Sequence, residues 1–210
     1  VPEHAEVFYY VRHPEARGLQ GIWERVEAAA RGAALGTGTE VSWEIIHGNH
    51  PVLPNETLAR VVDAALRRVG GPRWDDADRS FARTLRESLP EDAPGEGAEA
   101  RIRPFAMAHR KGSTDVGDLS WLVPTAGLRV ATWVPGTAPH TWQAVAAGGT
   151  PIGEKGMIVA ARVLALAAGE LYREPETLAR ARAELLRRRG PDFRYEPLLG
   201  DREPPLDYRR

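Results

Sequence analysis

Apolar and polar residues alternate at the start of the chain. Between Ala5 and Arg12 one face carries Ala, Val and Tyr side chains, and the other carries Glu, Phe, Tyr and Arg. This period of two predicts a strand, which Pro14 ends. We predict a second strand over residues 39–46 and a strand-like run over residues 128–134.

Other segments carry apolar residues at helical spacing. This spacing predicts helices over residues 19–33, 58–69, 80–87 and 151–168, and a more polar helix that begins at Pro175 and ends at Gly190. Asn55 and Thr150 are placed to cap two of these helices at their N-terminal ends. We expect residues 90–97 to form an exposed loop, and the tail after residue 190, with Pro197, Pro204 and Pro205, to be extended.

The order of these elements predicts an α/β fold. A strand, a helix and a second strand within the first 46 residues make a unit too small to be independent. Such a unit is typical of one half of a sandwich whose other strands lie upstream. Because position 1 is Val and a strand follows at once, we expect a chain cut from a longer protein.

Composition narrows the class of protein. The chain has 28 basic and 29 acidic residues, so its charge favours neither a nucleic-acid partner nor a membrane surface over a small molecule. Hydrophobic residues make up 42% of the chain, which is enough for a core, and no apolar run approaches the roughly 18 residues of a membrane span. We expect a cytoplasmic protein. The absence of cysteine excludes disulfides and thiolate metal ligands, so a metal would bind through His, Asp and Glu.

Site-like chemistry is concentrated between residues 112 and 143. His140 follows the strand-like run, at the edge where α/β folds place ligands, although a lone histidine is more often a hydrogen-bonded structural group. Asp115 and Asp118 fit paired acid and base groups, but Asp beside Gly and Ser is equally a turn former. Both interpretations stay open for the two aspartates.

Three further positions also have two interpretations. Arg12 at a strand end could grip a substrate carboxylate through its planar guanidinium, or could form a surface ion pair. His47 and His50 are three apart, a spacing that suits a metal on a helix, but Gly48, Asn49 and Pro51 favour a polar turn.

Long motifs resemble one hydrolase family. The runs GSTDVGDLSWLVPT at 112–125 and GTAPHTWQAVAAGGTPIGEKGMIVAARVLA at 136–165 resemble the carboxy-terminal part of the aminobenzoyl-glutamate utilisation family. That family is in the amidohydrolase branch of the co-catalytic metallopeptidases, which includes aminoacylase and hippurate hydrolase. The resemblance continues upstream through residues 1–14, 30–41 and 53–58.

The resemblance implies a metal-dependent amidohydrolase that cleaves the amide bond of N-acyl amino acids, aminobenzoyl-glutamate among them. Residues 1–50 then correspond to the later part of a small α/β lid sandwich that supports dimerisation. Residues 51–210 correspond to the carboxy-terminal part of a larger α/β catalytic domain. As partners the resemblance implies a small-molecule substrate and either a second copy or a related subunit.

The resemblance also assigns residues. His140 matches the last metal ligand, for zinc or manganese, of a family that binds two ions, and Arg12 and Asn55 match positions that approach the substrate. The other metal ligands and the general-base Glu of the family lie in an amino-terminal half that has no counterpart in these 210 residues. We therefore expect catalysis to belong to the parent enzyme. The alternatives are a non-catalytic subunit or interaction module without metal chemistry, and a binding domain without turnover.

Overall fold

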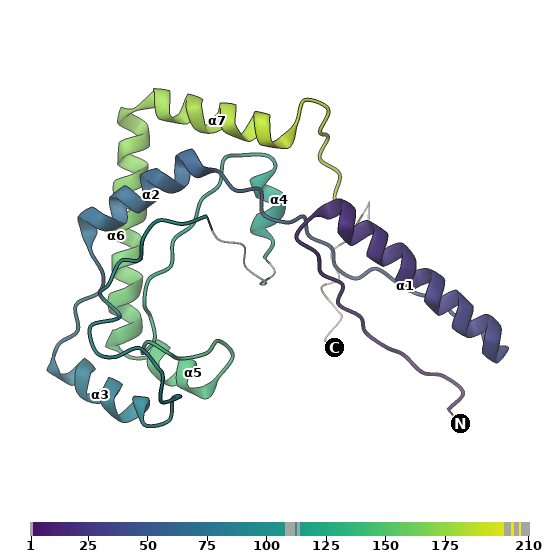
Figure 1. The fold of residues 1–210 in the computed structure, drawn as a ribbon, viewed down its shortest axis with the longest axis horizontal. Helices are drawn as coiled ribbons and strands as arrows, with labels where there is room; N and C mark the ends of the chain where they lie inside the picture. The colour runs from purple at the N-terminus through teal and green to yellow at the C-terminus, as the bar shows by residue number, and fades with distance from the viewer. Residues whose placement is uncertain (1, 108–111, 113, 200–202, 204–205, 207–210) are drawn as a thin grey trace. The chain divides into compact units, whose positions relative to one another are not determined.

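The computed structural model describes residues 2–107, 112, 114–199, 203 and 206. In this part of the chain it contains seven helices (Figure 1). Their bounds are α1 Ala16–Thr37, α2 Glu56–Val69, α3 Asp76–Arg86, α4 Val116–Ser120, α5 Trp142–Gly148, α6 Pro151–Arg173 and α7 Pro175–Arg189.

The helices predicted from apolar spacing are confirmed. Asn55 accepts a hydrogen bond from the backbone N–H of Leu58, and Thr150 accepts one from the N–H of Ile152, so both residues are N-caps as predicted. The last helix begins at Pro175, as predicted. The short helices α4 and α5 were not predicted, because a helix of five or seven residues carries too few turns for a periodic pattern.

Strands are absent from the described residues, so segments 5–12, 39–46 and 128–134 are not strands in this structure. Alternation determines which side chains share a face, but a strand also needs a neighbouring strand that pairs with its backbone. The α/β class and the lid sandwich therefore stay predictions. Pro204 and Pro205 of the predicted extended tail lie outside the described residues.

The chain divides into two compact units. The first comprises Val1–Leu53, Ala108–Val123 and Arg189–Arg210, and the second comprises Pro54–Met107 and Pro124–Arg188. The assignment of residues 1–50 to a lid and 51–210 to a catalytic domain stays a prediction.

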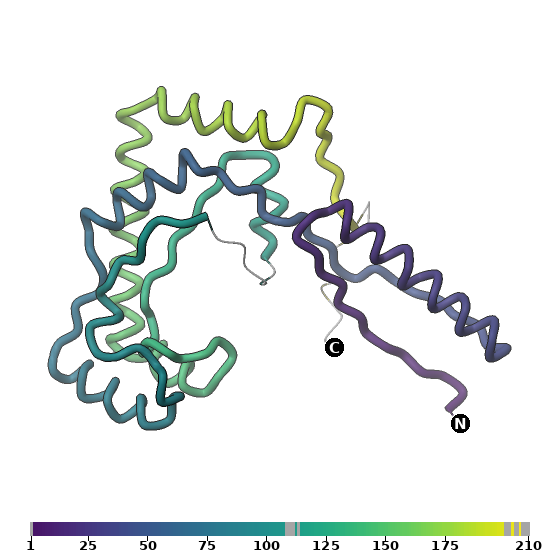
Figure 2. Tube along the Cα trace, in the orientation of Figure 1, coloured from purple at the N-terminus to yellow at the C-terminus, as the bar shows by residue number. Residues whose placement is uncertain are grey.

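The second unit is organised around α6. At the N-terminal end of α6, Ile152 is fully buried with Trp74, Leu85, Val134 and Ala147. Farther along, Val159, Val163 and Ala167 of α6 pack against Val62 and Ala65 of α2. The segment 124–134 follows the length of α6 between these two clusters (Figure 2), and its residues Ala126, Leu128 and Val130 are half-buried on the second cluster.

A lysine and two aspartates connect α3 to α6. Asp75 and Asp78 form a capping box at the start of α3, in which each side chain accepts a hydrogen bond from the other residue's backbone N–H. Lys155 of α6 makes ion pairs with both carboxylates, at 2.7 Å to Asp75 Oδ2. The hydrogen bonds from Lys155 and from the Asp78 backbone lower the pKa of Asp75, so it is ionised at neutral pH. The start of α3 is thereby fixed beside the first turn of α6.

The first unit contains α1 and α4. None of the residues of α1 is buried. On one side of α1, the indole N–H of Trp23 donates to Glu27 at 2.7 Å, and Arg31 pairs with Glu27 and lies 4.6 Å above the ring of Trp43. No helix in the described residues is both long and apolar enough to span a membrane.

Candidate functional site

The five predicted site residues are divided between the units. Arg12, Asp115 and Asp118 belong to the first unit, and Asn55 and His140 belong to the second. Within the second unit, Asn55 is held by α7, which follows the C-terminal end of α6, whereas His140 precedes α5, which packs on the first turns of α6. Asn55 and His140 are therefore associated with opposite ends of α6.

His140 has an unusual backbone conformation. Its φ angle is 62°, in the left-handed region. Among the described residues, His140 is the only non-glycine residue with a positive φ. Its side chain is exposed, and no described residue hydrogen-bonds to its ring. The structural and the metal-ligand interpretations of this histidine both stay predictions. Residues in sparsely populated backbone conformations cluster at binding and catalytic sites, which makes His140 a candidate for such a role.

Contacts on both sides anchor the turn that carries His140. Before the turn, Val134 is buried, and its carbonyl oxygen accepts a hydrogen bond from the N–H of Thr137 at 3.1 Å. After it, Gln143 of α5 donates to the backbone oxygen of Ser88, just beyond α3, at 3.3 Å. The turn is therefore attached to the core at one end and to the α3 region at the other.

Asn55 is buried, with 2% of its surface exposed. Its Oδ1 accepts from the N–H of Leu58 at 2.9 Å, and its Nδ2 donates to the backbone oxygen of Ala181 at 2.8 Å. The side chain thus caps α2 and connects it to α7. The helix-cap interpretation is confirmed, and the substrate-binding role that the resemblance implies stays a prediction.

Asp118 holds two distant segments of the first unit together. Its Oδ1 accepts from the hydroxyl of Tyr195 at 3.0 Å, and its Oδ2 accepts from the backbone N–H of His50 at 3.2 Å. Burial raises the pKa of the Tyr195 phenol, and the hydrogen bond to Asp118 and its negative charge raise it further. This carboxylate has a structural function in the described unit.

The helix α4 packs tightly on the segment before residue 54. A β-carbon at Gly117 would overlap the backbone oxygen of His50, so only glycine fits there. Ser120 is fully buried and accepts a hydrogen bond from the N–H of Leu53 at 2.8 Å, and the indole N–H of Trp121 donates to the oxygen of Pro51 at 2.8 Å. Much of the site-like chemistry of this run therefore builds a scaffold.

Asp115 and Arg12 remain available on the surface. Both residues are exposed. The Asp115 carboxylate is 3.5 Å from the hydroxyl of Thr114, a weak hydrogen bond. Asp115 and Asp118 do not share equivalent surroundings, because only Asp118 is bound to Tyr195 and His50. The paired acid and base role of the two aspartates stays a prediction.

Two residues that the sequence analysis did not single out have strong contacts. Tyr195 lies 77 positions from its partner Asp118, and its ring packs 5.6 Å from that of His50. Glu184 is buried and accepts hydrogen bonds from the start of α2, 127 and 128 positions away. Local patterns carry no signal for such pairs, because both partners look like ordinary polar residues in their own segments.

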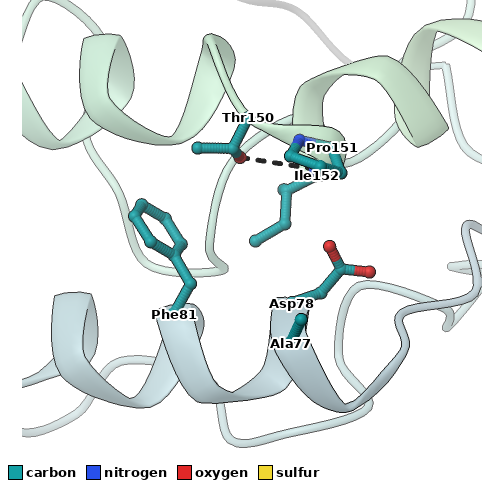
Figure 3. A pocket seen from close by; sticks show the side chains of 6 residues that line it. All are labelled: Ala77, Asp78, Phe81, Thr150, Pro151 and Ile152. Atoms are coloured by element: carbon teal, nitrogen blue, oxygen red, sulfur yellow. Dashed lines mark hydrogen bonds between the residues drawn. The ribbon is translucent and has the colours of Figure 1, made fainter.

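A small pocket lies between α3 and the start of α6 (Figure 3). Its lining is mostly apolar, with Ala77 and Phe81 from α3 on one side and Pro151 and Ile152 from α6 on the other. The pocket encloses about 140 Å³, too little for a dipeptide-sized substrate. None of the five predicted site residues lines it.

The described residues do not form a metal centre. No group of three or more His, Asp or Glu residues is arranged to hold an ion in this part of the chain. His140 can contribute one imidazole, whereas a protein metal site normally has three or more ligands. The residues present therefore do not fit a complete zinc or manganese site.

Comparison with known proteins shows which proteins the chain resembles. No protein-family model matches the chain, and no solved structure matches it. Three curated proteins do match, and all three are named as hydrolases or dipeptidases. The chain is homologous to these hydrolases, and the resemblance to a carboxy-terminal portion of this group is confirmed.

The matching relatives are much longer than this chain. The B subunit of the p-aminobenzoyl-glutamate hydrolase of Escherichia coli is 32% identical over 211 residues, covering 88% of this chain and 44% of the relative. The Xaa-Arg dipeptidase of Mus musculus is 28% identical over 88% of this chain and 36% of the relative. The human Xaa-Arg dipeptidase is 29% identical over 85% of this chain and 35% of the relative. The chain thus spans less than half the length of each of these relatives.

Proposed function

We propose that this chain is part of a metal-dependent amidohydrolase that cleaves the amide bond of N-acyl amino acids. The identity of 32% with the E. coli p-aminobenzoyl-glutamate hydrolase over most of the chain supports the reaction class. It also makes p-aminobenzoyl-glutamate the first substrate to test. The similarity to the Xaa-Arg dipeptidases supports cleavage of the same type of bond, an amide between an acyl group and an amino acid.

His140 carries the proposal within the chain. Its imidazole is exposed, has no hydrogen-bond partner among the described residues and is held in a left-handed conformation. A neutral imidazole with an accessible nitrogen can serve as one ligand of zinc or manganese. We assign His140 as one metal ligand, and the described residues contain no group of three or more His, Asp or Glu residues that would complete the site.

The proposed test measures hydrolysis by the protein translated from the complete reading frame that encodes this chain. Release of p-aminobenzoate from p-aminobenzoyl-glutamate is followed with added zinc or manganese, and the bound metal is quantified in parallel. His140→Ala should lower kcat/KM by at least about 100-fold and reduce the metal content. Loss of a residue that only orients a metal ligand typically costs about 10–100-fold, and loss of a direct ligand should cost more. His47→Ala is the matched control, since it removes another exposed imidazole from the chain.

One result would reject this function, and another would reject the role of His140. If the protein with its full metal content hydrolyses neither p-aminobenzoyl-glutamate nor Xaa-Arg dipeptides, the non-catalytic alternative replaces it. If His140→Ala keeps both the metal and the turnover, His140 is not a ligand.

Assembly is a separate part of the proposal. The E. coli relative is named as a subunit, which supports a second copy or a related subunit as partner. We propose a homodimer or a heterodimer. Light scattering of the purified protein, alone and after co-expression with a candidate related subunit, distinguishes the two arrangements from a monomer.

A further inference from the structure

The hydroxyl group of Thr141 connects the two sides of the turn that carries His140. Thr141 Oγ1 donates to the backbone oxygen of Ala138 at 2.8 Å and accepts from the N–H of Ala144 at 3.4 Å. The first bond closes the chain across His140, and the second caps α5. One side chain therefore links the residues before His140 to the helix after it.

His140 needs such a restraint. A side chain with a β-carbon rarely adopts a φ of 62°, and the surroundings must enforce this conformation. The ring contributes nothing to this, because it is exposed and without a hydrogen-bond partner among the described residues. The direction of the imidazole therefore depends on the backbone of the turn.

Other contacts fix only the outer ends of this turn. At Gly136, whose φ is 99°, a β-carbon would lie 2.6 Å from the β-carbon of Ala93, so the chain passes close to the 93–94 loop. Gln143 binds Ser88 from within α5. Among the described residues, the hydrogen bond from the Thr141 hydroxyl to the Ala138 carbonyl is the one side-chain contact between these anchor points that spans His140.

We propose that Thr141 is a positioning residue for His140. Its hydroxyl group holds His140 in the left-handed conformation and so sets the direction in which the imidazole projects. The positioning of the imidazole does not depend on the proposed function. Its consequence for hydrolysis does rest on the proposed function, in which His140 is a metal ligand.

Two substitutions separate the two bonds of Thr141. Thr141→Asp keeps an oxygen that caps α5 but has no proton to donate to Ala138 at neutral pH. Thr141→Ser keeps both bonds. Thr150→Val is the matched control, because Thr150 makes the same pair of contacts at α6, donating to Ala147 at 2.7 Å and accepting from Ile152 at 3.3 Å.

Nuclear magnetic resonance of the 210-residue chain with labelled histidine tests the geometry. The Cα and Cβ chemical shifts of His140 report its φ and ψ angles. We expect left-handed values in the parent chain, in Thr141→Ser and in Thr150→Val, and a shift to ordinary values in Thr141→Asp. If His140 keeps its left-handed shifts in Thr141→Asp, the positioning role is wrong.

Hydrolysis by the product of the complete reading frame is the second measurement. Thr141→Asp should lower kcat by at least about 10-fold, because small displacements of reacting groups cost large factors in rate. Thr141→Ser and Thr150→Val should stay within about twofold of the parent. If Thr141→Asp changes the His140 shifts while His140→Ala leaves hydrolysis intact, the positioning role stands and the proposed ligand role of His140 falls. If the shifts change and hydrolysis falls in His140→Ala but not in Thr141→Asp, the positioning has no functional consequence and the inference is overturned.

Discussion

Glu184 of α7 and Thr57 of α2 are joined by two hydrogen bonds. Glu184 Oε2 accepts from the Thr57 backbone N–H at 2.8 Å and from its hydroxyl at 2.6 Å. The other oxygen accepts from the N–H of Glu56 at 2.8 Å and from Arg188 at 2.7 Å. A buried carboxylate from one helix thus binds the positive end of another, which favours the ionised form.

This carboxylate should make the stability of the protein fall in acid. Burial alone would raise the pKa of Glu184, but the hydrogen bonds from Thr57, Glu56 and Arg188 outweigh it and lower the pKa from 4.5 to about 2. Because the folded pKa lies below the unfolded one, the stabilisation is complete above about pH 4.5 and is lost as the pH falls towards 2. The shift corresponds to on the order of 3 kcal/mol. Urea unfolding at pH 7, 4 and 2.5 measures it.

Glu184→Gln is the control for this pH dependence. The amide nitrogen of Gln would place an N–H donor against the N–H groups of α2. The variant should therefore be less stable than the parent by about 2–3 kcal/mol at pH 7. The difference from the parent should shrink as the pH falls from about 4.5 towards 2, because the parent loses the stabilisation from its ionised carboxylate over this range. An unchanged difference between pH 7 and pH 2.5 would show that charge is not the cause.

Two glycines of α6 should respond oppositely to alanine. A β-carbon at Gly156 would overlap the backbone oxygen of Ala131, which cannot move without displacing the segment beside α6. At Gly169 the nearest group is the flexible end of Arg173, 3.2 Å away. We expect Gly156→Ala to cost about 1–3 kcal/mol and Gly169→Ala to add up to about 1 kcal/mol through helix propensity. Thermal unfolding followed by circular dichroism distinguishes the two, and equal effects would contradict the packing described for Gly156.

Tyr195 should titrate above the usual range of a phenol. Burial, the hydrogen bond to Asp118 and the charge of Asp118 all favour the neutral hydroxyl and raise its pKa. Asp118→Asn removes the charge and should bring the pKa of Tyr195 back towards 10. Titration of tyrosine Cζ signals measures this, with Asp115→Asn as the matched control because Asp115 does not contact Tyr195. A pKa that is unaffected by Asp118→Asn would show that the two side chains are not bonded in solution.

Local signals in the sequence predicted most of the helices. Asn55 was identified as a cap because its side chain acts on an N–H three residues away, within the same segment. The capping role of Thr150 was visible for the same reason. Such short-range contacts depend only on residue type and spacing.

Contacts between distant segments could not be predicted in this way. Glu184 looked like one polar residue of a polar helix, and its buried position follows only from the packing of α7 on α2. Asp118 was placed in a site because of its neighbours in sequence, whereas its bonds reach Tyr195 and His50. The alternation in residues 5–12 indicated a strand, but pairing depends on a neighbour that the alternation does not specify. His140 was singled out by its sequence neighbours, whereas its left-handed backbone had no signal in the sequence.

The conformation of His140 predicts a trade between stability and function. Glycine adopts a φ of 62° without strain, whereas alanine and histidine do not. His140→Gly should therefore be more stable than His140→Ala by about 1 kcal/mol, after part of the gain is offset by the greater freedom of glycine in the unfolded chain. His140→Asn should lie between them, because asparagine tolerates the left-handed region. Both Gly and Ala variants lack the imidazole, so both should lose hydrolysis to the same extent in the product of the complete reading frame.

Chemical denaturation of the three variants and the parent measures this order. The order is informative because a glycine at this exposed position would relieve the backbone strain. A strained residue is expected to be retained at such a position where its side chain has a function. His47→Gly is the matched control, since His47 is exposed but has no positive φ, and glycine there should not stabilise the chain. If His140→Gly is no more stable than His140→Ala, the turn does not hold residue 140 in the left-handed region in solution. A stabilised Gly variant that retains full hydrolysis would instead show that the strained histidine is dispensable for the reaction.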